Sequence, residues 1–154
     1  MQFIVLDESI AVDLGPDDRN WDSSDQDWFY INNGVWYVNA GVIWDGATAV
    51  PDGGSHPDKP GYPLIWLATL IHDLGYMFMI EEDFPYTRKE IDKLFKRLMD
   101  EAGFSLSLIY FLGVRHFGGI WNFIFNIYRT IWHKERQLPA HLDEYTLTEI
   151  SVYT

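Results

Sequence analysis

The 154-residue sequence contains no cysteine, and this absence excludes disulfides, thiolate zinc sites and cysteine nucleophiles. Basic residues are also scarce, since 11 Lys and Arg stand against 23 Asp and Glu, for a formal net charge of −12. Nucleic-acid phosphates and anionic lipids are bound by basic side chains. We therefore expect no nucleic acid as a partner of this chain, and no attachment to an anionic membrane surface.

The sequence also lacks the apolar runs that export or anchor a chain. Residues 1–10 contain no basic n-region and no long hydrophobic stretch, so we expect no signal peptide. Synthesis in the cytoplasm without Sec export is the expectation. The longest apolar stretch, residues 106–132, is interrupted by polar residues such as Arg115, Asn122 and Arg129. Because charges at mid-bilayer are costly, this stretch predicts a buried helix rather than a transmembrane span.

The sequence does contain enough apolar and aromatic residues to form a hydrophobic core. Hydrophobic residues make up 47% of the chain and aromatic residues 17%, which is typical of a globular protein. The length favours a single domain over residues 1–154. The acidic residues are unevenly spread, because residues 1–60 hold eleven acids and two bases. We expect this excess to form a solvated loop rather than a cation-binding one.

Residues 1–44 predict strands and an acidic loop. A short strand is expected at residues 3–6. Residues 28–31 and 35–43 flank Asn32-Asn33-Gly34, which favours a β-hairpin because Asn and Gly tolerate positive φ.

Two segments predict irregular structure. Residues 7–27 are acidic and are broken by Gly15-Pro16. Residues 45–61 are dense in Gly, Pro and Asp, which predicts a long loop.

Residues 62–134 predict a helical core. The capping-box pair Thr87 and Glu90, with Gly103 after the last turn, delimits one helix clearly. The helices are expected at residues 62–80, 87–102 and 105–134, the last with a break near Gly118-Gly119. The tail, residues 135–154, includes a candidate strand at residues 145–152. The fold class that follows is α+β, mainly α, with an N-terminal β-hairpin or small sheet packed on a core of about three helices.

Two adjacent ionisable residues, His72 and Asp73, lie within the otherwise apolar residues 63–80. A charge in such surroundings is costly unless it is paired, hydrogen-bonded or bound to a metal. Tyr76 follows His72 by one helical turn and shares its face. The pattern predicts either a functional site or a buried polar pair that fixes the packing of helices.

Neighbouring helical residues point about 100° apart, so His72 and Asp73 are expected to serve different partners. We expect His72 to face the second helix, where Asp92 accepts its Nδ1–H and suits it to act as a general base. Asp73 is expected to face the loop of residues 45–51. With Asp45 and backbone carbonyls it could hold a hard cation such as Ca²⁺. A transition metal ligated by His72, Asp73 and another histidine is the alternative.

Three further residues are expected to support this site. Arg88 lies four residues before Asp92, a spacing that allows an ion pair. Arg115 has apolar neighbours and needs a partner, for which Asp92, Asp73 and the C-terminal segment are candidates. Thr48 belongs to the loop motif Asp-Gly-Ala-Thr that begins at residue 45.

These motifs, in this order, resemble a family of phage and bacterial proteins catalogued as domain of unknown function 1353. The resemblance covers about residues 35–120. It rests on DGATAVP at residues 45–51, IHDLGY at residues 71–76, TRKEIDKLF at residues 87–95, Met99 and Gly103, and GVR at residues 113–115 followed by Gly118. It implies a phage or prophage source and supports treating these positions as one site.

A second similarity concerns chemistry. In secreted phospholipases of the bacterial type, a helix carries His-Asp followed by Tyr, and a later helix supplies an Asp that supports the His. There the His activates a water, and the adjacent Asp binds Ca²⁺ together with a preceding loop. His72, Asp73, Tyr76 and Asp92 match that order, although no cysteines flank them here.

Two hypotheses follow. In the first, the chain is a small metal-assisted hydrolase of phage origin that acts on a lipid ester or a cell-wall bond of the host envelope. His72, Asp92 and Tyr76 would be catalytic, and Asp73 and Asp45 would bind Ca²⁺. In the second, it is a non-catalytic virion or tail-assembly protein that contacts phage structural proteins or itself. The virion is then a second expected location, and the His-Asp-Arg cluster is a structural network.

Overall fold

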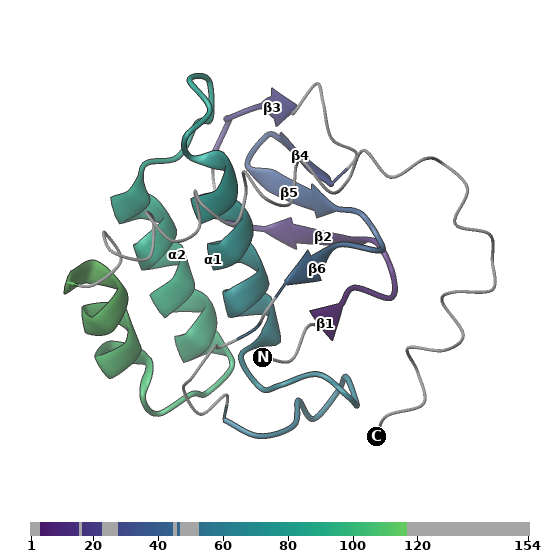
Figure 1. Cartoon of the computed structure of the whole chain (residues 1–154), viewed down its shortest axis with the longest axis vertical. Helices are drawn as coiled ribbons and strands as arrows, with labels where there is room; N and C mark the ends of the chain where they lie inside the picture. The colour runs from purple at the N-terminus through teal and green to yellow at the C-terminus, as the bar shows by residue number, and fades with distance from the viewer. Residues whose placement is uncertain (1–3, 16, 23–27, 45, 47–52, 117–154) are drawn as a thin grey trace, which may run out of the picture.

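The computed structural model describes residues 4–15, 17–22, 28–44, 46 and 53–116. Within these ranges the chain has an α+β fold, in which small antiparallel sheets are followed by three packed helices. Figure 1 shows the helices gathered on one side of the strands, with α1 nearest to them. This arrangement confirms the predicted fold class.

A four-stranded sheet has the order β2-β5-β4-β3, with every neighbouring pair antiparallel. Its strands are β2 (Ile10–Asp13), β3 (Trp21–Asp22), β4 (Phe29–Asn32) and β5 (Val35–Val38). A separate pair joins β1 (Ile4–Val5) to β6 (Ile43–Trp44).

The predicted hairpin is confirmed, and its turn has the expected backbone. Asn33 and Gly34 connect β4 to β5 with φ values of 49° and 75°, the positive values that a two-residue hairpin turn requires. Gly34 also lies against Asp17, whose Cβ would be 2.6 Å from an added methyl group. The second strand ends at Val38, earlier than predicted, because the chain turns near Gly41 and pairs again as β6.

The prediction of an irregular segment at residues 7–27 was wrong, because β2 and β3 lie within it. In β2 the buried Val12 alternates with the exposed Ala11 and Asp13, the period expected of a strand with one face on the core. Two of the acidic residues that suggested a loop, Asp13 and Asp22, lie on the solvent face of these strands.

Helices α1 and α2 begin and end within about four residues of their predicted limits. Helix α1 (Trp66–Phe78) starts later than residue 62, because Pro63 forms an isolated β-bridge with Ser55. Helix α2 (Arg88–Glu101) has the predicted capping box between Thr87 and Glu90. The third helical stretch covers residues 107–116, and its predicted continuation to residue 134 lies outside the described residues, as does the candidate strand at 145–152.

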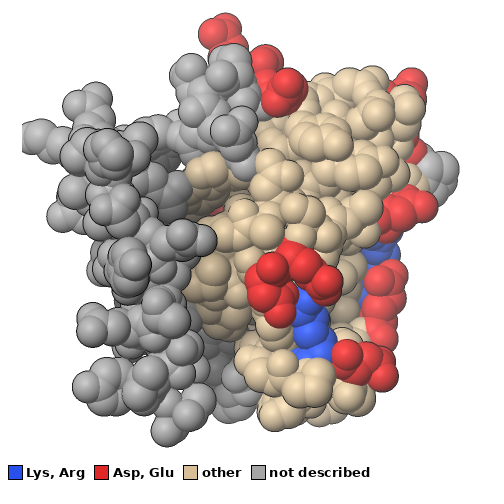
Figure 2. Space-filling view, turned by 90° about the vertical axis from the view of Figure 1, so that its right-hand side faces the viewer, with Lys and Arg blue, Asp and Glu red and all other residues tan. Residues whose placement is uncertain are grey.

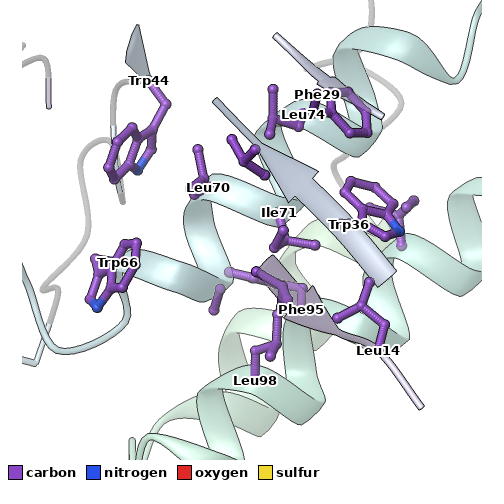
Figure 3. Close-up of a cluster of buried hydrophobic side chains, with 14 of the residues drawn as sticks. Leu14, Phe29, Trp36, Trp44, Trp66, Leu70, Ile71, Leu74, Phe95 and Leu98 are labelled. Atoms are coloured by element: carbon purple, nitrogen blue, oxygen red, sulfur yellow. The ribbon is translucent and has the colours of Figure 1, made fainter. Parts of the chain in front are cut away.

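The core is built from aromatic side chains of the sheet and apolar side chains of the helices (Figure 3). Phe29 stacks on Trp36 with ring centroids 4.9 Å apart, and Phe29 also packs edge-on against Phe78 of α1. Such aromatic pairs contribute beyond their buried area. No helix in the described part of the chain is long and apolar enough to cross a membrane.

Candidate functional site

Helix α1 is buried on nearly all sides, because the sheet packs on one face and α2 on another. His72 and Asp73 lie at its centre, with 11% and 13% of their side chains exposed. Ile71 and Leu74, which flank them, are almost completely buried. The two ionisable groups are thus held at the edge of the core, as the sequence predicted.

Asp92 of α2 is the centre of the polar network around His72. Its side chain is fully buried. Its Oδ1 accepts a hydrogen bond of 2.6 Å from the hydroxyl of Tyr76, and its Oδ2 accepts one of 3.0 Å from Nη1 of Arg115. Both carboxylate oxygens are therefore satisfied by groups from two other helices, which is what a buried charge requires.

His72 lies between two carboxylates. Its Nε2 is 3.6 Å from Oδ1 of Asp92, and its Nδ1 is 3.7 Å from Oδ1 of Asp73. Both distances exceed that of a direct hydrogen bond, so the contacts are electrostatic. The imidazole is also flanked by Tyr76 and Phe95, whose ring centroids lie 4.2 and 4.5 Å from its own. These two rings restrict the orientation of the imidazole, and with it the directions of its two nitrogens.

The predicted assignment of the imidazole nitrogens was wrong. We expected Asp92 to lie at Nδ1, but it faces Nε2, and Asp73 takes the position at Nδ1. The 100° separation of neighbouring residues does not keep Asp73 away, because Nδ1 is the ring nitrogen closer to the backbone. His72 and Asp73 therefore share one site.

Arg88 and Arg115 join the third helix to this network. The Nε of Arg88 donates to the hydroxyl of Tyr76 at 3.1 Å, and its Nη2 donates to the carbonyls of Val114 and Arg115. Arg88 comes only within 4.0 Å of Asp92. It therefore links Tyr76 to the third helix, and Arg115 is the closer cation to Asp92.

Charge within the network is mutually stabilised. Burial alone would lower the pKa of His72, but the carboxylates of Asp73 and Asp92 outweigh it and hold that pKa above its usual range. Burial would raise the pKa of Asp92, but contacts from His72, Tyr76 and Arg115 keep it below its usual range. Burial and the bond to Asp92 raise the pKa of Tyr76. These shifts favour the ionised form of Asp92 and the neutral form of Tyr76, and they stabilise the protonated form of His72 relative to a free imidazole.

The cation site predicted for Asp73 is described only in part. Asp45 and Thr48 lie outside the described residues, and so does most of the loop that was to supply carbonyl ligands. Within the described ranges, no three His, Asp or Glu side chains are grouped closely enough to hold a metal ion. The described residues alone therefore do not form a complete site, and Asp73 is its one predicted ligand among them.

Sequence reasoning did not assign Phe95 to the site. Its ring nevertheless packs on the imidazole, with the two ring centroids 4.5 Å apart. The signal was present, because Phe95 follows Asp92 by three residues and so lies on the same helical face. The carbonyls that receive Arg88 carried no signal in the sequence, since every residue has one.

Comparison with protein-family models, with curated proteins and with solved structures found no match to this chain. The resemblances described for its motifs therefore remain predictions.

Proposed function

We propose that this protein is a small metal-assisted hydrolase of phage origin, acting on a host envelope substrate that is either a lipid ester or a cell-wall bond. The observation that carries the proposal is the line Asp92–His72–Asp73, in which a buried imidazole has a carboxylate at each nitrogen. The phage source and the envelope substrate are inferred from the motifs in the sequence.

The two carboxylates would have different roles. Asp92 is fully buried and held by Tyr76 and Arg115, so it is suited to fix the Nε2 side of His72. The Nδ1 side faces Asp73. Above its raised pKa, His72 is a neutral imidazole. With Nε2–H directed to Asp92, it presents its lone pair at Nδ1 and can take a proton from a water there. His72 is thus the general base, Asp92 and Tyr76 position it, and Arg88 and Arg115 hold Asp92 and Tyr76 in place.

Asp73 is a hard oxygen ligand beside the base, and Ca²⁺ is the cation that such ligands favour. We propose that Asp73 binds it together with Asp45 and the loop that contains Thr48. When bound, the cation would polarise the carbonyl or phosphoryl group of the substrate.

The first experiment is a calorimetric titration of the wild type and of Asp73→Asn with Ca²⁺, followed by Zn²⁺ and Mg²⁺. The proposal expects Ca²⁺ binding that the variant loses. Hydrolysis of phospholipid vesicles and of peptidoglycan is then measured for the wild type, His72→Asn and the control His56→Asn. His72→Asn should lower the rate by about 10²-fold or more, because it removes the general base. Absence of both cation binding and hydrolysis in the wild type would refute the proposal.

A second candidate is the non-catalytic virion or tail-assembly protein. One observation favours it: an apolar strip on the third helix, where Leu108, Ile109 and Leu112 are exposed by 56%, 63% and 47%, next to Leu106. Exposed apolar groups of this kind mark contacts with other subunits. Arg115 would then neutralise Asp92 to lock three helices together, with no catalytic role for His72.

Sedimentation velocity separates the two candidates. If the protein is a virion or tail-assembly component, the wild type associates at micromolar concentration and the Ile109→Ser variant does not. Val5→Ser is the matched control, because Val5 is a comparably exposed apolar residue on β1. Hydrolysis of phospholipid or peptidoglycan by a monomeric wild type would exclude the hypothesis of a non-catalytic assembly protein.

A further inference from the structure

The outer face of the four-stranded sheet is a surface that the proposed hydrolase does not use. Residues with buried side chains alternate along each strand with residues that face solvent. The outward residues, which we call the tyrosine face, are Ala11, Asp13, Asp22, Tyr30, Asn32, Val35 and Tyr37.

Two stacked tyrosines form the centre of this face. Tyr30 and Tyr37 are directly paired across β4 and β5, and their rings are nearly parallel, 4.8 Å apart between centroids and inclined by 8°. Tyr30 is 41% exposed. The strand register places Ala11 beside Tyr37 and Asp22 beside Tyr30. Each tyrosine is therefore covered by its partner on one side and has a small or acidic neighbour on the other.

The acids of the tyrosine face lack basic partners within the described part of the chain. No ion pair joins Asp13 or Asp22 to a lysine, arginine or histidine there. Both side chains are exposed. Asp22 lies beside Tyr30. Asp13 lies two residues along β2 from Ala11, the neighbour of Tyr37. The surroundings are also acidic, since residues 1–60 hold eleven acids and two bases. Acidic side chains likewise outnumber basic ones on the side of the molecule shown in Figure 2.

A planar cation fits this combination of groups. The guanidinium of arginine stacks on a tyrosine ring while its N–H groups pair with a carboxylate, whereas the ammonium of lysine is a compact charge that cannot stack. The molecule uses this recognition internally. The guanidinium of Arg19 lies over the ring of Tyr86 at 4.5 Å and pairs with Asp17 at 3.3 Å. The ammonium of Lys59 makes a similar contact over Tyr62 at 4.6 Å, but as a point charge, so the arginine preference rests on planar stacking.

We propose that the tyrosine face is a docking surface for an arginine-bearing, extended segment of a partner protein. Arginine side chains of that segment stack against Tyr30 and Tyr37 and pair with Asp22 and Asp13. Charge complementarity selects this occupant, because the acidic face repels nucleic acid and anionic lipid and attracts a basic chain.

The test uses two labelled peptides of equal charge, one of four Arg-Ser repeats and one of four Lys-Ser repeats. Their binding to the full chain is measured by fluorescence anisotropy at 0.15 M NaCl. We expect the arginine peptide to bind more tightly. Tyr30→Thr and Tyr37→Thr keep a strand-forming residue, and each should weaken binding about two- to fivefold.

Asp22→Asn is the isosteric variant that keeps the fold, and it should weaken binding of the arginine peptide by a similar factor of about two to five. Asp58→Asn is its matched control, because it removes the same charge from an exposed loop away from the sheet. The proposal fails if both peptides bind equally, or if Asp58→Asn weakens binding as much as Asp22→Asn. It also fails if the wild type binds neither peptide.

Discussion

Asp92 is the residue on which the polar core depends. Its carboxylate is fully buried and receives hydrogen bonds from Tyr76 and Arg115, while His72 lies beside it. Removing one partner of a buried charge cluster lowers the stability of the fold more than replacing the whole cluster with apolar residues. The reason is that the remaining charges stay buried without compensation. This holds whether the network serves catalysis or only packing.

Asp92→Asn should therefore lower the free energy of unfolding by about 3–5 kcal/mol. The variant keeps the shape of the side chain, so the loss measures charge rather than packing. Asp100→Asn on the same helix is the control. Asp100 is exposed and is held by Lys96 and by the hydroxyl of Ser107, so its substitution should cost much less than that of the buried Asp92. Urea unfolding followed by circular dichroism gives both values, and equal losses would contradict the buried network.

The polar residues that meet around His72 could be chosen from the sequence, but the geometry of the contacts could not, and Phe95 was missed. A His-Asp pair in an apolar helix, and an Asp on the next helix, are visible as violations of an apolar pattern. Which nitrogen of His72 faces Asp92 depends on a side-chain rotamer, and no pattern in the sequence encodes it. The hydrogen bonds from Arg88 to backbone carbonyls cannot be predicted from the sequence either, because every residue carries a carbonyl group.

Among the elements, the helices and the hairpin were predictable and two strands were not. The capping box of α2 and the Asn-Gly turn are local signals, and local contacts decide those elements. Strands β2 and β3 are short, and they exist because β5 and β4 pair with them across the sheet. The acidic residues on their outer face give these segments the composition of a loop. Pairing with β5 and β4 nevertheless makes them strands.

The contact between α1 and α2 depends on a residue without a side chain. A methyl group on Gly75 would lie 2.6 to 2.9 Å from three side-chain carbons of Ile91, which is itself fully buried. Gly75→Ala should therefore destabilise the protein by about 1–3 kcal/mol, despite the better helix propensity of alanine.

Gly113→Ala is the matched control for this substitution. Gly113 lies in the third helix, and an added methyl group would meet no atom within 4 Å. At this position only the higher helix propensity of alanine changes, so we expect the substitution to stabilise the protein by up to about 1 kcal/mol. Opposite signs in thermal unfolding for the two variants would support the packing of α1 on α2, and stabilisation by both would contradict it.

The start of α2 should make stability depend on pH. Burial works against ionisation of Glu90, but the bonds from Thr87 and Arg19 outweigh it and lower its pKa from 4.5 to about 2. A pKa lower in the folded state than in the unfolded state stabilises the fold above pH 4.5, and this contribution is lost as pH falls towards 2. Glu90→Gln should therefore be less stable than the wild type at pH 7, with a difference that shrinks below pH 4.5. A difference independent of pH between 7 and 3, measured by urea unfolding, would refute this role.

The molecule as a whole carries an excess of like charge that opposes its own folding. Its net charge is −12, and the ion pairs in the described part of the chain leave acids such as Asp13 and Asp22 without basic partners. Salt screens repulsion between exposed charges at distances beyond about 8–10 Å, and it also weakens exposed ion pairs. Because acids outnumber bases about two to one, we expect the relief of repulsion to be the larger effect. Raising NaCl from 10 to 500 mM should therefore raise the Tm, by about 2–4 °C for each kcal/mol gained. A Tm that falls with salt would instead mean that ion pairs such as Arg19–Glu90 dominate the charge balance of the fold.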